Sequence, residues 1–106
     1  MKVLFDQGTP VPLRHALDKH VVSTSYEMGW SKLDNGSLLK VAEKEFDVLV
    51  TTDQNLRFQQ NLAGSRIAIL VLPTTSWPKI QAHLTLVAQA LDSLCPGELR
   101  EITLPA

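Results

Sequence analysis

The sequence lacks several features that would assign it to a specialised class of protein. Cys95 is the only cysteine among 106 residues, which excludes an internal disulfide and a zinc site built from cysteines. No apolar run approaches the roughly 18 residues that a membrane-spanning helix needs. The start of the chain reaches an acidic residue, Asp6, too soon for a secretory signal peptide. We therefore expect a cytoplasmic protein that makes no contact with membranes.

An excess of charge of one sign is also missing. The formal net charge is −1, and charged residues make up 20% of the chain. Without a broad basic field, any binding of nucleic acid must be local. The length and the 44% content of hydrophobic residues are typical of a globular protein with one core. We expect residues 1–106 to form a single domain.

Three short apolar runs predict strands. They are continuous rather than alternating, which is typical of parallel strands covered by helices on both faces. A fourth candidate strand is weaker, and a fifth is expected at an edge of the sheet because a proline follows it closely. In the order of their strength, these five segments are 3–5, 48–50, 67–72, 20–24 and 99–104.

Helical patterns lie between the predicted strands. Thr9 and Pro10 resemble a cap and a first-turn proline, and Asn35 can cap a helix over 36–46. Ser76 opens the clearest helix, whose apolar spacing continues to a stop at 95–97. Strands that alternate with helices predict a three-layer α/β/α fold with a mainly parallel sheet of four to five strands.

Two acidic residues each follow a predicted strand. In open α/β sheets, ligands bind beyond the carboxyl ends of the strands, where the strand order reverses. If the first and third strands are neighbours, the carboxylates of Asp6 and Asp53 project into one crevice. Such a pair suits a hard divalent cation such as Mg²⁺. The alternative is local: Asp53 could cap a helix over 54–62, and Asp6 could belong to a turn.

The segment that follows Asp53 is rich in amides. Gln54, Arg57 and Gln59 could present hydrogen-bond donors to a phosphate or a base, and a solvated surface helix is the alternative. Glu27 is a further candidate beside the crevice, with an ordinary loop acid as its alternative.

Three stretches of the sequence resemble small bacterial PIN-like proteins that are grouped as a family of unknown function. The stretches are 2–8, Leu38-Leu39 with Ala42, and 49–55, and the resemblance runs from Met1 to about Leu72. PIN domains are metal-dependent ribonucleases, and many are the toxins of toxin–antitoxin pairs. The resemblance implies a PIN-like fold, Mg²⁺ or Mn²⁺ as cofactor, RNA as substrate, an antitoxin protein as a partner and a homodimer. It makes Asp6 and Asp53 the catalytic and metal-binding candidates.

The chain departs from the related proteins at two places. They often carry an acidic cluster where this chain has Asn35, and a second acid where it has Asn55. Amide oxygens can coordinate a metal without adding charge, and Glu27 or Asp34 could compensate. Two functions therefore stay open: a ribonuclease, or an inactive PIN-like module that binds RNA or a protein partner.

Response-regulator receivers also carry acids after their first and third strands. Thr74 or Thr75 would fit the receiver plan. Receivers, however, resemble one another in a paired acid at the first strand and a lysine after the last strand. Here Asp6 stands alone and residues 104–106 contain no lysine, so the receiver class is disfavoured.

Overall fold

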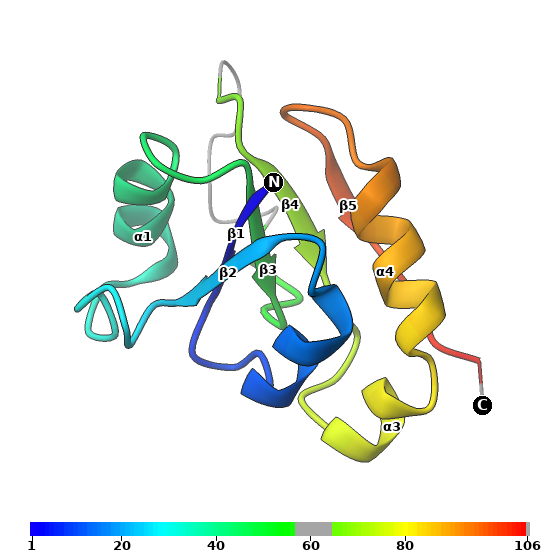
Figure 1. Cartoon of the computed structure of the whole chain (residues 1–106). Helices are drawn as coiled ribbons and strands as arrows, with labels where there is room; N and C mark the ends of the chain where they lie inside the picture. The colour runs from blue at the N-terminus through cyan, green and yellow to red at the C-terminus, as the bar shows by residue number, and fades with distance from the viewer. Residues whose placement is uncertain (57–64, 106) are drawn as a thin grey trace.

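The computed structural model describes residues 1–56 and 65–105, and within them a parallel sheet lies between two layers of helices (Figure 1). All neighbouring strands are parallel, in the order β2-β1-β3-β4-β5. The predicted α/β class and the mainly parallel sheet of four to five strands are confirmed. In chain order the elements are β1 (Lys2–Phe5), η1 (Val11–Leu17), β2 (Val21–Thr24), α1 (Asn35–Ala42), β3 (Val48–Thr51), β4 (Ala68–Val71), α3 (Trp77–Gln81), α4 (Leu84–Ser93) and β5 (Leu99–Glu101).

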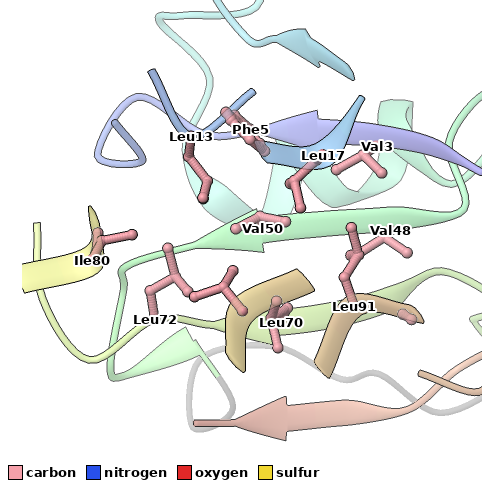
Figure 2. Packing of buried hydrophobic residues seen from close by; sticks show 12 residues of the cluster. Val3, Phe5, Leu13, Leu17, Val48, Val50, Leu70, Leu72, Ile80 and Leu91 are labelled. Atoms are coloured by element: carbon pink, nitrogen blue, oxygen red, sulfur yellow. The ribbon is translucent and has the colours of Figure 1, made fainter. Parts of the chain in front are cut away.

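The hydrophobic core is divided by the sheet into two clusters. Because side chains alternate along a strand, Val48 and Val50 of β3 face the cluster under η1, α3 and α4, while Leu49 faces the cluster under α1. Figure 2 shows the first cluster, in which Leu13 of η1 and Leu91 of α4 pack onto the strands. Burial on both faces explains why the sequences of the central strands are continuously apolar.

The order of the strands brings two chain segments together at the carboxyl edge of the sheet. From β1 the chain moves outward to β2, and then returns past β1 to form β3 on its other side. Leu4 pairs with Leu49, and Phe5 with Val50. The residues that follow β1 and β3 are consequently neighbours, at the point where strand order reverses.

The apolar runs of the predicted strands lead us to expect that Leu4, Val22, Leu49 and Ile69 are nearly fully buried. Leu4, Leu49 and Ile69 are at most 1% exposed, which confirms this for three of them. Val22 is only half-buried, so the prediction is wrong there. The reason is that β2 is an edge strand, and the adjacent Val21 is 64% exposed.

The long helix expected from Ser76 is two helices. His83 has φ −133° and ψ 37°, which is not helical, and it separates α3 from α4. Figure 1 shows the two helices at an angle to each other. The break lets Ile80 of α3 and Val87 of α4 both reach the first core cluster, an arrangement that depends on tertiary packing.

Two expected helix caps are also different. Asp34, rather than Asn35, caps α1, because its carboxylate accepts a 2.7 Å hydrogen bond from the backbone N–H of Ser37. Thr9 does not cap η1, because its hydroxyl is bound elsewhere. The last strand is shorter than the expected 99–104 and lies at an edge, as predicted. No helix in the described part of the chain is long and apolar enough to cross a membrane.

Candidate functional site

Asp6, directly after β1, is the most enclosed polar group at the carboxyl edge of the sheet. It is 9% exposed. Its Oδ1 accepts hydrogen bonds from the backbone N–H of Thr9 at 3.1 Å and from the Thr9 hydroxyl at 2.8 Å. Its Oδ2 accepts the hydrogen of the Thr51 hydroxyl. A buried carboxylate is costly unless it is hydrogen-bonded, and three neutral donors meet that need here.

Thr51, the last residue of β3, connects the carboxylate of Asp6 to the backbone of Asp53. It is fully buried. Its Oγ donates to Asp6 Oδ2 and accepts a 3.1 Å hydrogen bond from the backbone N–H of Asp53. Because a hydroxyl carries one donor and can accept as well, a single side chain fixes Asp6 and the backbone of Asp53 relative to each other.

Asp53 is half-buried and is bound from two sides. Its Oδ2 accepts from the side-chain amide of Asn35, the first residue of α1. Its Oδ1 accepts from the backbone N–H of Asn55 at 2.9 Å. This second bond is the local turn-capping role considered from the sequence. Asn35 therefore joins the network through its side chain, whereas the side chain of Asn55 is exposed.

A small hollow of about 90 Å³ lies against this network, with room for a few water molecules. Asp6 and Asn35 line it, together with the turn that precedes α1. Its lining residues are Asp6, Gln7, Gly8, Ser25, Trp30, Ser31, Leu33, Asn35 and Leu38.

Gly8 allows the loop after β1 to lie close to the loop after β3. A Cβ atom added at Gly8 would lie 2.3 Å from the Oγ1 of Thr52, which is far inside van der Waals contact. The absence of a side chain at this position keeps the two loops of the site together.

The oxygen atoms of the network are of the chemical kind that a divalent cation takes as ligands. A carboxylate offers about four lone-pair positions. Among the described residues, Asp6 Oδ1 already accepts two hydrogen bonds, whereas Asp6 Oδ2 and each carboxylate oxygen of Asp53 accept one. The Oδ1 of Asn35 is also available, since its amide nitrogen donates to Asp53. Two carboxylates and an amide oxygen suit Mg²⁺ or Mn²⁺. Across residues 1–56 and 65–105, no three His, Cys, Asp or Glu side chains gather as a metal-binding group.

Glu27 forms an ion pair with Arg14 instead of joining this network. Arg14 donates to it through both terminal nitrogens, one at 3.2 Å to Oε2. Glu27 Oε1 also accepts from the backbone N–H of Thr24 at 2.9 Å. The hydrogen bond from Arg14, followed by that from Thr24, holds the pKa of Glu27 below its ordinary value.

The other predicted residues lie in several places. The side-chain nitrogen of Gln54 donates to the carbonyls of Thr52 and Leu72, which ties this loop to the end of β4. Asp34, considered as a compensating acid, is exposed at its helix cap, and the hydrogen bond from the Ser37 backbone lowers its pKa. Arg57 and Gln59 lie outside the described residues.

Sequence reasoning missed the threonines that hold Asp6. Thr9 was interpreted as a helix cap, and Thr51, which directly follows the predicted strand 48–50, was given no role. Thr9 Oγ also lies 2.9 Å from the carbonyl oxygen of Val50, so its single hydrogen is shared between that carbonyl and Asp6 Oδ1, and the hydroxyl links the loop after β1 to β3. The sequence contained one indication of this role. A threonine at the end of an apolar strand is expected to bury its hydroxyl, which then needs a hydrogen-bond partner.

A larger, separate groove of about 720 Å³ lies between α3 and the residues after β5. Its walls are mainly apolar, with Pro73, Pro78 and Leu104 among them, and Lys79 and His83 are its titratable residues. It contains no carboxylate, so we place the candidate chemistry at the smaller hollow, where Asp6 lies.

Comparison of the chain with family models, with curated proteins and with solved structures found no match. The function is therefore inferred from the residues of this site and from their hydrogen bonds.

Proposed function

We propose that the protein is a metal-dependent ribonuclease of PIN-like type, with Asp6 and Asp53 as its catalytic, metal-holding residues. The observation that carries the proposal is the link through Thr51, whose hydroxyl bonds to the carboxylate of Asp6 and to the backbone of Asp53 at the point of strand-order reversal. We further propose that it acts in the cytoplasm, as a homodimer and as the toxin of a toxin–antitoxin pair.

In the proposed site, Asp6 would be a rigidly held ligand, and Asp53 would offer open positions for coordination. Asp6 is fixed by Thr9 and Thr51, so its one open position on Oδ2 has a defined direction. Asp53 is more exposed and keeps an open acceptor position on each oxygen, which can orient a water molecule. Mg²⁺ or Mn²⁺ bound there would activate water and offset negative charge on a phosphate.

Residues around the network would position the RNA. Arg57, Gln54 and Gln59 follow Asp53 in the chain and supply donors for phosphate oxygens or base edges. The side-chain nitrogen of Gln54 already donates to the carbonyls of Thr52 and Leu72, so Gln54 would hold the loop while Arg57 and Gln59 meet the substrate.

A second function is favoured by one observation. Both oxygens of Asp6 already accept hydrogen bonds from neutral donors, an arrangement that needs no cation. Asn35 and Asn55 bring amides where related PIN-like proteins often have acids. These features support a catalytically inactive module that binds RNA or a protein partner at the same crevice.

Cleavage assays with one isosteric substitution separate the two functions. Wild type, Asp53→Asn and Asp18→Asn are incubated with RNA in Mn²⁺ and in chelator. Asp18 is exposed at the end of η1, outside the network, so its substitution is a matched control. The ribonuclease predicts cleavage that needs metal, that persists in Asp18→Asn and that disappears in Asp53→Asn. RNA binding without cleavage in any metal would instead support the binding module.

A further inference from the structure

Tyr26 is the most exposed of the large hydrophobic side chains in residues 1–56 and 65–105. It is the only tyrosine of the chain and is 79% exposed. Within the described part of the protein, its ring makes no aromatic contact and its hydroxyl no hydrogen bond. It lies in the turn between β2 and α1, drawn in cyan in Figure 1.

Backbone hydrogen bonds hold this turn in one shape. Ser25 N–H donates to the carbonyl of Phe5 at 2.8 Å, and Trp30 N–H donates to the carbonyl of Ser25 at 2.8 Å. Gly29, with φ +78°, donates to the carbonyl of Tyr26 at 3.0 Å. Tyr26 is therefore presented to solvent from a fixed backbone, which reduces the entropy lost when its ring binds a ligand.

A side-chain clamp next to Tyr26 adds to this rigidity. Thr24 and Glu27 exchange hydrogen bonds, at 2.9 Å from the Thr24 N–H and at 3.1 Å from the Glu27 N–H. Arg14 of η1 binds the carboxylate of Glu27 as well. The residue before Tyr26, Ser25, is thus bound to Phe5, and the residue after it, Glu27, is bound to Arg14 of η1.

The same turn borders the candidate site. Ser25, Trp30 and Ser31 line the hollow that contains Asp6. Lys32 lies between two lining residues and is exposed, and it has no ion pair within the described residues. An exposed aromatic ring, and a cation that has no ion pair in the described part of the chain, are therefore adjacent in sequence to residues that line the hollow.

We propose that Tyr26 stacks on a base of single-stranded RNA, while Lys32 contacts a neighbouring phosphate. This inference rests on the proposed function, because the RNA is expected to extend from the Asp6 hollow. Every base offers a face to an aromatic ring, and single-stranded nucleic acids are commonly bound by such stacking beside basic side chains.

The surroundings of Tyr26 favour RNA over a protein partner. Of the other large apolar side chains between β2 and α1, Met28 and Trp30 pack inward against the second core cluster, and Leu33 is 38% exposed, seven residues along the chain from Tyr26. The immediate neighbours, Ser25 and Glu27, are polar. A protein interface would require Tyr26 at the centre of a packed apolar patch, whereas stacking on a base requires a single accessible ring.

Fluorine NMR with fluorotyrosine incorporated in the full chain tests this directly, since one tyrosine gives one resonance. The probe is a single-stranded oligoribonucleotide of about eight nucleotides, in the range that such sites cover, added in chelator so that no cleavage occurs. We expect the resonance to shift as RNA binds. Tyr26→Ala should weaken binding about 5- to 150-fold, Tyr26→Trp should retain it, and Lys32→Gln should weaken it and reduce its salt dependence.

The outcomes separate this inference from the proposed function. RNA binding with an unmoved resonance and with equal affinity in Tyr26→Ala would overturn the stacking role while leaving RNA binding intact. A shifted resonance and weakened Tyr26→Ala, in a protein that cleaves no RNA with any metal, would support the stacking role and overturn the ribonuclease. A wild type that binds no RNA, in chelator or in Mn²⁺, would overturn the stacking role.

Discussion

The hydroxyl of Thr51 donates to the carboxylate of Asp6 across the boundary between β3 and β1, although 45 residues separate the two in the chain. The same hydroxyl accepts from the backbone of Asp53. The positions of the Asp6 carboxylate and of the Asp53 backbone thus depend on a strand residue inside the sheet. Any change at Thr51 should affect both of them.

Thr51→Val should destabilise the protein. Valine has a similar shape but cannot satisfy Asp6 Oδ2 or the N–H of Asp53, and each unsatisfied buried group costs about 1–3 kcal/mol. Thr51→Ser keeps the hydroxyl and should lose only about 1 kcal/mol for the missing methyl group. The measurement is the free energy of unfolding in urea. Equal losses in the two variants would show that the hydroxyl has no special role.

Gly8→Ala should displace the side chain of Thr52. The new Cβ would lie 2.3 Å from Thr52 Oγ1, so this hydroxyl must rotate away or the loop must shift, at a cost of about 1–3 kcal/mol. Thr52→Ala removes the obstacle, and the double variant should regain most of the loss. A double-mutant cycle from urea unfolding measures this coupling. Additive effects of the two substitutions would contradict the steric explanation.

Mn²⁺ should stabilise the wild type against heat. A ligand that binds only the folded protein adds about 2.7 kcal/mol to the free energy of unfolding when its free concentration is 100 times its Kd. Asp53→Asn removes one of the two negative charges and should lose most of the increase in Tm, whereas Asp18→Asn should keep it. This measurement is independent of cleavage. An equal rise of Tm in all three proteins would indicate metal binding elsewhere.

The Arg14–Glu27 pair should contribute an acid-sensitive part of the stability. The pKa of Glu27 lies below its ordinary value of 4.5 in the folded protein. Its contribution is therefore fully present above about pH 4.5 and is lost as the pH falls through the lower, folded-state pKa. Thermal melts of wild type and Glu27→Gln should differ at pH 7 and converge in acid. A difference that is independent of pH would contradict this linkage.

The strands could be predicted because they depend on local sequence. Continuous apolar runs such as 48–50 are typical of strands buried on both faces, and the acids that follow β1 and β3 were expected at the carboxyl edge of the sheet, where the structure has them. The break at His83 could not be predicted, because the apolar spacing continues through it and only packing onto the sheet selects it. The roles of Thr9 and Thr51 could be predicted only in part: a threonine at the end of an apolar strand is expected to need a partner, but the partner of Thr51, Asp6, lies 45 residues away.

The sequence also could not predict which of two residues caps a helix or which partner a charged side chain takes. Asp34 and Asn35 are both good caps, and the choice between them is made by the bond from Asn35 to Asp53. Glu27 could have joined the carboxylates, but Arg14 is held beside it by the packing of η1. A sequence pattern names such candidates, and the tertiary contacts decide which partner each of them takes.

The all-parallel sheet described above has a consequence for how the protein reaches its native state. Its strands pair only with segments far along the chain, and none of the described pairs is a hairpin. Chains with mostly distant contacts fold slowly, because loops must close before those contacts form. The carboxylate site depends on one of the longest closures, between β1 and β3. Ribosome-bound nascent chains that end before β3 therefore have no site, and the site forms only after the first half of the protein has been synthesised.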